Sequence, residues 1–376
     1  MFEKNKSRDE MQIDLVVDAG LANIAQFMWT VNENKDINTV VTGKSPIWLY
    51  NYDPVAYEED GSTVRSAVKM WDICTRVGSG SASVPKEGAT DAWKLIAKKY
   101  DAFCKLRGDC MFIADGLRPL CISGNRKRVT KTNFDSSVVK TINPFMKYIT
   151  GLVDTSYGCG NCDWYQIVDP TSGVNMWMPP SVKMMCSMLD TTNAKFYWTV
   201  PVGVNNGKMN PVDNPSKVKV IDIAFSPTTQ DAGDIYTKSW NYAKYYEDDG
   251  FVLEGQRTFQ SRPTAFDRIN VRRLFLYLER KTYNAAKYFV YEGNTAYTRQ
   301  RLIDAIKPYF DAAKINGGLY DYRIVCDETN NTPDTIDRNE LHVKIAIKPT
   351  KAIEFIECTF VALRTGASFT EAGMKD

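Results

Sequence analysis

Residues 264–289 have the sequence TAFDRINVRRLFLYLERKTYNAAKYF, and this stretch decides how the second half of the chain folds. Thr264 and Asp267 have the spacing of a capping box, in which two side chains bond reciprocally to two backbone N–H groups, so we expect a helix to open at Thr264. Apolar residues then recur at intervals of three, four and seven, which places them on one helix face. They are Val271, Leu274, Leu278, Ala285 and Phe289.

The same stretch carries a concentration of positive charge. Six basic residues and a single acid, Glu279, lie between Arg268 and Lys287, although the whole chain has a net charge of only +2. Such a face can simply keep a helix soluble, but arginine also pairs well with carboxylates across an interface. We hypothesise that the following residues contact acidic groups on neighbouring molecules: Arg268, Arg272, Arg273, Arg280 and Lys287.

A second helix and three strands are predicted to follow. The helix is expected to begin at Thr298, and Pro308 should kink or end it because proline lacks an N–H donor. Gly317-Gly318 can supply a left-handed stop. The residues expected to face inward are Leu302, Ile303, Ile306 and Phe310. Alternating or continuous apolar patterns predict strands at 320–326, 341–347 and 353–363.

Three strands covered by two helices form a small sheet with open edges. Exposed edges are rarely left free, and strand addition from another molecule is one physical solution. We therefore expect this sheet to accept strands from neighbouring subunits. The candidate interface residues on it are Tyr322, Ile324, Val343, Ile345, Phe355 and Phe360.

Several blocks in this region resemble the contractile tail sheath proteins of large, myovirus-type bacteriophages. They occur in the family's order and spacing, and they are FDRINVRRLF (266–275), YDYRIVCDETNNTP (320–333), IDRN (336–339), IKP (347–349) and FVALRTG (360–366). A looser similarity extends through Ser156-Tyr157, Asp169-Pro170, Pro179-Pro180 and Pro201-Val202-Gly203. The chain thus resembles this family most closely over its last hundred or so residues.

The resemblance implies a structural subunit and no enzyme. Sheath subunits polymerise as stacked hexameric rings around a tail tube, and contraction drives that tube through the host envelope. The implied partners are other copies of the chain in a six-fold helical lattice, the tail tube protein, and baseplate and tail terminator proteins. The implied location is the virion, after assembly in the host cytoplasm. No cofactor, metal, nucleic acid or membrane insertion is implied. A minor tail component and a secretion-type contractile sheath subunit are the alternatives.

The start of the chain departs from the family pattern. Family members carry an N-terminal arm and a further N-terminal part before a strand like the one predicted at Ile13–Val17, whereas this sequence reaches that strand almost at once. We expect either that those parts are encoded elsewhere or that the subunit is truncated or divergent.

Length and composition favour two domains. The chain has 376 residues, of which 44% are hydrophobic and 24% charged, as is typical of globular proteins with a real core. We predict a central α/β domain at 1–204 and a C-terminal domain of two helices on a small open sheet at 205–376, divided in the segment 205–215, which is rich in Asn, Gly and Pro. The fold class is therefore α/β, or more broadly α+β. Net charge favours neither nucleic acid nor membrane.

The first domain is predicted from alternating strands and helices. Strands are expected at 13–17 and 110–114, with an amphipathic helix at 91–107 between them. A hairpin is expected at 164–168 and 174–178, followed by a helix from Pro179-Pro180 to about Leu189. A further helix is expected at 138–153, and a loop at 226–233.

Candidate chemistry in this sequence is sparse. Cys159 and Cys162 have the spacing of a redox pair, but a strand-like run follows them instead of a helix, so we expect a structural loop and keep a redox enzyme as a minor alternative. The nine cysteines are odd in number and scattered, which favours reduced thiols. His342, the only histidine, has no partner for catalysis. Solvated or capping roles are expected for the cluster 125–128 and for Asp14, Asp18 and Asp115.

Overall fold

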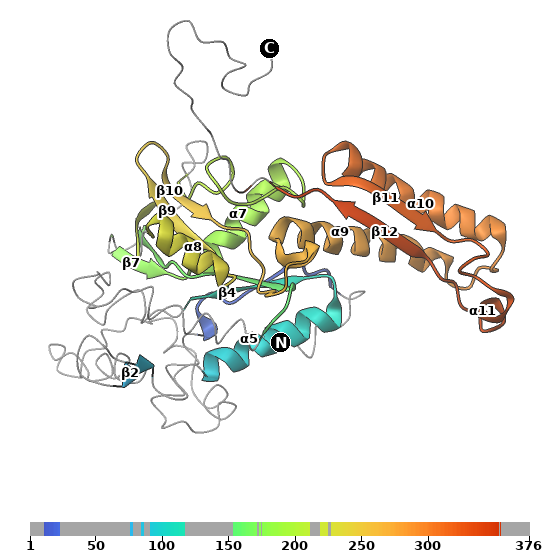
Figure 1. Ribbon diagram of the computed structural model, residues 1–376, viewed down its shortest axis with the longest axis horizontal. Helices are drawn as coiled ribbons and strands as arrows, with labels where there is room; N and C mark the ends of the chain where they lie inside the picture. Colours follow the sequence, from blue (N-terminus) through green and yellow to red (C-terminus); the bar gives the residue numbers. More distant parts are fainter. Residues whose placement is uncertain are drawn as a thin grey trace, which may run out of the picture.

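The computed structural model describes residues 11–22, 76–77, 84–85, 91–116, 153–170, 173, 175–210, 219–224, 227–352 and 354. Figure 1 shows a body of mixed helices and strands, from which two long helices and a two-stranded sheet extend to one side. We call this extension, residues 269–349, the arm. The mixed α/β class predicted from the sequence is confirmed.

A parallel sheet forms the centre of the body. Its order is β1 (Leu15–Val17), β4 (Met111–Asp115) and β5 (Gly158–Asn161), with β4 paired in parallel to both neighbours. Strand β4 is buried along its whole length, as expected when both faces of a parallel sheet are covered. Phe112 and Ala114 pack into one hydrophobic core, and Met111 and Ile113 pack into a second.

Helix α5 (Asp91–Arg107) covers the first of these cores, and its bounds are those predicted. Its apolar face puts Trp93, Tyr100 and Phe103 into the core. Gly108 follows the helix with φ of +65°, a conformation that glycine adopts without a steric penalty. A short ladder of β2 (Arg76–Val77) and β3 (Val84–Pro85) precedes α5 in the chain.

A second, antiparallel sheet has the order β7, β6, β8. The predicted hairpin is confirmed as β6 (Tyr165–Val168) and β7 (Asn175–Met178). Helix α7 (Pro180–Ala194) starts at the predicted proline but runs five residues beyond Leu189. The third strand, β8 (Val220–Ile223), pairs with β6 across the segment 205–215 that we predicted to divide two domains. Residues on either side of that segment therefore share one sheet, and the division itself stays a prediction.

The loop predicted at 226–233 is wrong, because helix α8 (Thr229–Thr237) begins there. The Thr228 hydroxyl accepts a hydrogen bond from the Asp231 N–H, and the Asp231 carboxylate accepts one from the Thr228 N–H. This capping box starts the helix although Gly233 lies inside it. After α8, strands β9 (Tyr242–Tyr246) and β10 (Gly250–Glu254) form an antiparallel hairpin that the sequence did not reveal.

The arm begins later than predicted. Thr264 caps a single 3-10 turn, η2 (Ala265–Asp267), and helix α9 (Ile269–Ala286) starts after it and continues into the turn η3 (Lys287–Phe289). Helix α10 (Ala296–Ile315) is capped by the Thr295 hydroxyl and not by Thr298, which instead supplies the bonded N–H. The helix does not end at Pro308 and continues for seven residues beyond it.

The predicted glycine stop of α10 is confirmed. Gly317 has φ of +73°, and the Gly318 N–H donates to the Ala313 carbonyl, which closes a Schellman motif. Strands β11 (Leu319–Val325) and β12 (Lys344–Pro349) then pair antiparallel, with the short helix α11 (Pro333–Asp337) in their connection. The third predicted strand, 353–363, lies outside the described residues except for Glu354.

Candidate interaction site along helix α9 and the arm sheet

The basic residues of α9 do not share one exposed face. Arg272 and Arg273 are each only 5% exposed, Arg268 and Arg280 are partly buried, and Lys287 is exposed. Four of the five predicted interface residues therefore turn toward their own chain. Whether any of them also contacts another molecule stays a prediction.

Arg268 belongs to an ionic network at the junction of the arm with the body. Its guanidinium forms a bidentate pair with the Glu354 carboxylate and a further ion pair with Asp267 at 2.8 Å. Arg257 also reaches Asp267, at 3.1 Å, and the Tyr236 ring lies within cation–π distance of both guanidinium groups. Burial alone would raise the pKa of Glu354, but hydrogen bonds, chiefly from Arg268, hold that pKa below its usual range.

Arg272 and Arg273 are buried without a carboxylate partner among the described residues. The Arg272 guanidinium lies 3.5 Å from the centroid of the Tyr157 ring and 5.1 Å from that of Phe266. Arg273 donates to the Thr192 hydroxyl at 2.5 Å, and its burial lowers its pKa to about 10. These two cations are held by aromatic faces and neutral oxygens, which is the way a protein retains a charge that it has taken out of water.

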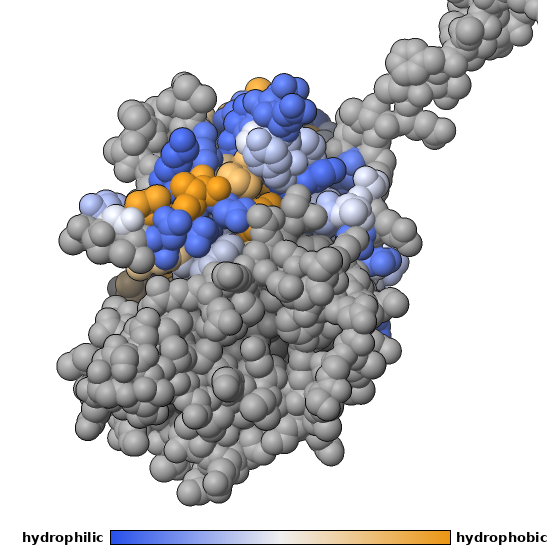
Figure 2. All heavy atoms as spheres, turned by 90° about the vertical axis from the view of Figure 1, so that its left-hand side faces the viewer, coloured by the Kyte–Doolittle hydropathy of each residue, from blue (hydrophilic) through white to orange (hydrophobic). Residues whose placement is uncertain are grey.

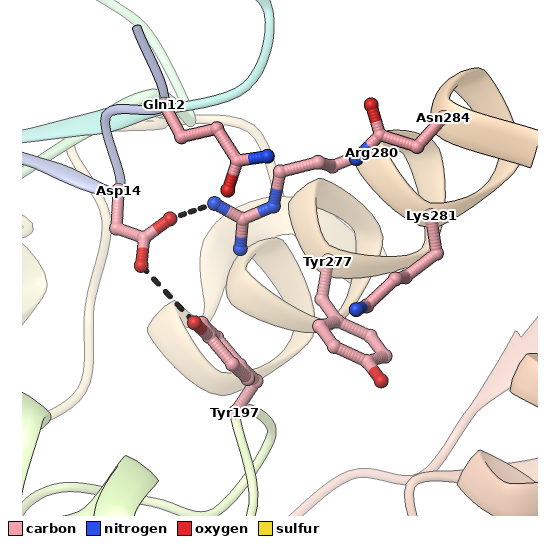
Figure 3. A pocket seen from close by; sticks show the side chains of 7 residues that line it. All are labelled: Gln12, Asp14, Tyr197, Tyr277, Arg280, Lys281 and Asn284. Atoms are coloured by element: carbon pink, nitrogen blue, oxygen red, sulfur yellow. Dashed lines mark hydrogen bonds and ion pairs between the residues drawn. The ribbon is translucent and has the colours of Figure 1, made fainter. Parts of the chain in front are cut away.

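Arg280 lines a cavity of about 340 Å³ between the start of β1 and the second half of α9. Figure 3 shows its guanidinium pointing to the Asp14 carboxylate, with which it forms an ion pair. The Tyr197 hydroxyl donates to the same carboxylate at 3.0 Å. The remaining lining residues are Gln12, Tyr277, Lys281 and Asn284. We name this cavity the α9 pocket.

The α9 pocket has an excess of positive charge. Its lining contains two cations, Arg280 and Lys281, and one carboxylate, Asp14. The Lys281 ammonium lies over the rings of Tyr277 and Tyr309 at 5.5 and 5.6 Å, and it has no ion pair among the described residues. Burial lowers the pKa of Arg280. Because the cations outnumber the carboxylate in the lining, the site favours a further negative group.

The arm sheet has one covered and one open face. Tyr322, Ile324 and Ile345 on the sheet, and Val343 directly before β12, are half-buried and pack onto the hydrophobic core that α9 and α10 share. The opposite face carries Arg323, Lys344 and Lys348, which are exposed. Among the described residues the sheet has two strands, so each strand has a side with no neighbouring strand. Phe355 and Phe360 lie outside the described residues.

The end of the arm carries exposed aromatic side chains that sequence reasoning missed. Tyr288, Tyr291 and Tyr297 are all exposed at the turn between α9 and α10, and Tyr291 has φ of +74°, which is uncommon for a residue other than glycine. The sequence did show several tyrosines close together around the predicted end of the first arm helix at Phe289. Their number alone does not reveal whether each ring is buried or exposed.

The cysteine pair has no geometry for redox chemistry. Cys159 lies inside strand β5 and Cys162 one residue after it, so the predicted structural loop is wrong and the segment is a buried strand. The two side chains are buried in different hydrophobic cores. Burial raises the pKa of Cys159 to about 12, whereas a reactive thiol needs a lowered pKa and access to solvent.

The acidic residues at the strand ends hold the turns around them. Asp18 accepts from the Ala22 N–H and the Tyr100 hydroxyl, and Asp115 accepts from the Gly20 and Ser181 N–H groups. The predicted capping role is confirmed for Asp18 and Asp115, whereas the Asp14 carboxylate instead pairs with Arg280. His342 is exposed, as predicted, and lies 3.1 Å from the Glu340 carboxylate, but it precedes β12 by two residues and is not part of a strand. The cluster 125–128 and the helix predicted at 138–153 lie outside the described residues, except for Val153.

The part of the chain that the structure describes contains no group of three or more histidine, cysteine and acidic side chains placed to hold a metal ion. In the same residues, no helix combines the length and the apolar character that crossing a membrane requires.

The fold matches solved components of contractile injection systems. It superimposes on a protein of the anti-feeding prophage baseplate with a TM-score of 0.55, at 18% identity over 74% of this chain and 67% of that one. It superimposes on a sheath protein from an extracellular contractile injection system in its contracted state with a TM-score of 0.54, at 19% identity over 71% of this chain and 68% of that one. At such identities the likeness is one of fold.

The sequence match is more specific. Residues 261–362 match the family described as the phage tail sheath C-terminal domain, so the resemblance predicted from the sequence is confirmed. The tail sheath protein of Enterobacteria phage T4 is 37% identical over 203 residues, which are 54% of this chain and 30% of that protein. The tail sheath protein of Vibrio phage KVP40 is 34% identical over 252 residues, 66% of this chain and 35% of that protein. The matched region thus spans about a third of the length of these relatives.

Proposed function

We propose that this chain is a structural subunit of a contractile phage tail sheath. It polymerises with other copies as stacked hexameric rings around a tail tube, and it contracts to drive the tube through the host envelope. The observation that carries the proposal is the arm, which lies within the region that matches the phage tail sheath C-terminal domain. In the described residues its sheet consists of two strands, so each strand has one edge that is not paired with another strand. The relatives are tail sheath proteins, which supports a structural role over an enzymatic one.

The open sheet supplies a physical basis for polymerisation. Strand addition satisfies backbone N–H and C=O groups at an edge, and it links subunits without fixing the side-chain interfaces that must rearrange during contraction. Tyr322, Ile324, Val343 and Ile345 would hold the sheet on α10 while its sides accept strands. Phe355 and Phe360 would belong to the following strand.

Of the five basic residues, Lys287 suits direct contact with a tail tube or a neighbouring subunit because it is exposed. Arg280 would be reached through the α9 pocket. Arg268, Arg272 and Arg273 would support the interface by holding α9 in place. The tail tube, baseplate and tail terminator proteins are the expected partners in the virion, after assembly in the host cytoplasm.

Negative-stain microscopy of the purified chain, alone and with a tail tube protein, tests this function. We expect ribbed tubes or stacked rings, and assembly with the tube that weakens as salt screens basic contacts. A proline in β12, placed where the N–H points away from β11, should leave the fold intact and stop polymerisation. A chain that stays monomeric with and without the tube would contradict the proposal.

A secretion-type contractile sheath is the second candidate, because the solved structures with the same fold belong to injection systems. The phage assignment is favoured by sequence identity, which is 34–37% to phage proteins and 18–19% to those structures. Mass spectrometry of purified phage particles distinguishes the two, since a phage sheath would be one of their abundant proteins.

A further inference from the structure

We propose that the α9 pocket of one copy receives the acidic tip of the β9–β10 hairpin of a second copy. This contact rests on the proposed self-assembly and names the surfaces that would meet. Its starting observation is the pocket itself, a concave site of about 340 Å³ lined by cations and aromatic rings. Cavities of this size are at the lower end of those that bind small molecules or inserted side chains.

The pocket is suited to carboxylates. Asp14 and Tyr197 hold the Arg280 guanidinium in place, which leaves Lys281 as the cation without a carboxylate among the described residues. Gln12 and Asn284 add amide groups to the lining, as Figure 3 shows. Tyr197 and Tyr277 stack at 5.0 Å, so one wall is apolar. An occupant should therefore combine negative charge with an aromatic or apolar group.

The β9–β10 hairpin has this composition. Its connection is Glu247-Asp248-Asp249, and Glu247 and Asp248 are exposed with no ion pair among the described residues. Asp249 is held by Lys208 at 2.7 Å, which fixes the base of the turn. Tyr245, next to the tip, is 52% exposed and packs against Phe251 with ring centroids 5.2 Å apart. The hairpin thus presents two exposed carboxylates beside an aromatic ring.

The two surfaces cannot meet within one molecule as it is folded. Figure 1 shows the hairpin at the end of the body away from the arm, whereas Arg280 and Lys281 belong to the second half of α9, within the arm. Figure 2, which looks at the hairpin end, shows hydrophilic side chains along its upper part around a smaller apolar area. A contact between different patches on two copies is heterologous, and such contacts build rings or helical filaments.

Charge reversal and its rescue test the contact. Lys281→Glu should raise the critical concentration for polymerisation at least about tenfold, because like charges would then face each other. The double variant Glu247→Lys with Asp248→Lys should do the same. Combining all three changes in one chain should return the critical concentration to within about threefold of wild type. The pocket would then carry the added negative charge and the hairpin tip the positive charges, so the two surfaces would attract each other again. Pelleting assays on the full-length protein measure these values.

Matched controls separate this contact from general charge effects. Lys307→Glu on α10 and Asp234→Lys on α8 change exposed residues outside both surfaces, and they should leave the critical concentration unchanged. If wild type and all three charge variants polymerise equally, the contact is overturned while the proposed function stands. The contact is also overturned if Lys281→Glu weakens assembly and the combined variant does not recover, since the occupant is then another molecule. If wild type never polymerises, both proposals fail.

Discussion

Asp18 and Asp115 show how strongly burial alters single residues in this protein. Asp18 is 3% exposed and its Oδ2 atom has no hydrogen-bond donor among the described residues, while Asp115 lies beside it at the end of the adjacent parallel strand. Burial first, and the negative charge of Asp115 second, raise the pKa of Asp18 well above its usual range. The folded protein therefore binds a proton that the unfolded chain releases at about pH 4.

This raised pKa predicts a pH dependence of stability. Because the folded state holds more protons, the free energy of unfolding should fall as the pH rises from about 4 toward the raised pKa of Asp18. Asp18→Asn mimics the protonated acid, so at pH 7 it should stabilise the protein by at least about 1 kcal/mol and flatten this dependence. Urea unfolding from pH 4 to 8 measures the difference from wild type. Parallel curves for the two proteins would contradict this account.

Arg273 within α9 and Arg268 directly before it predict different mutational effects. Arg273 has no carboxylate partner in the described residues, and without it the Thr192 hydroxyl would keep its own hydrogen bond to the Met188 carbonyl. Arg273→Met should therefore either increase the free energy of unfolding or change it by less than about 1 kcal/mol. Arg268→Met should cost about 1–3 kcal/mol, because Glu354 would lose its bidentate partner.

Urea unfolding followed by tryptophan fluorescence compares these two variants. A large decrease in the free energy of unfolding for Arg273→Met would show that this guanidinium contributes more to stability than its contacts indicate. A negligible decrease in the free energy of unfolding for Arg268→Met would show that Glu354 finds another hydrogen-bond donor. Gln256, which already donates to it at 3.0 Å, is one such donor.

At the level of secondary-structure elements, the glycines of α8 and α10 predict opposite responses to alanine. Gly233 lies inside α8, and a methyl group added at its Cα would meet no described atom within 4 Å, so Gly233→Ala should stabilise the protein by about 0.5–1 kcal/mol through helix propensity. Gly317 has φ of +73° after α10, so Gly317→Ala should cost about 1–2 kcal/mol. Thermal unfolding of both variants is the measurement, and a change of the same sign in both would be inconsistent with this explanation.

At the level of the whole molecule, α9 joins two hydrophobic cores. Ile269 and Leu276 pack with the strands of the body, whereas Leu274 and Leu278 pack with α10 and the arm sheet. A single rigid helix thus contributes to both cores. We expect body and arm to unfold together instead of as two independent domains divided at 205–215.

Leu276→Ala tests this coupling. Removing a buried leucine side chain should cost about 2–4 kcal/mol. Amide hydrogen exchange should then show that the free energy of opening falls by a similar amount in β4 of the body and in α10 of the arm. This is expected although Leu276 packs in the body core only. Faster exchange confined to the body would show that the arm is an independent unit.

The sequence by itself determined the elements whose pattern is local. The 3.6-residue period fixed α5 and the apolar face of α9, and the glycine pair fixed the end of α10. The run of family blocks from Phe266 onward predicted the similarity to tail sheath proteins. These features depend on neighbours within a turn or a strand, so they can be predicted from residues close together in the chain.

Only the tertiary structure decided what the charged residues do. The sequence predicted that Arg273, Arg280 and Lys287 contact acidic groups on neighbouring molecules, yet the partners of the first two within this chain, Thr192 and Asp14, lie far away in the sequence. Likewise, β8 joins β6 across a polar segment that resembled a domain boundary. Burial and pairing of this kind depend on contacts between distant segments, and a periodic pattern contains no information about which segment will cover a given face.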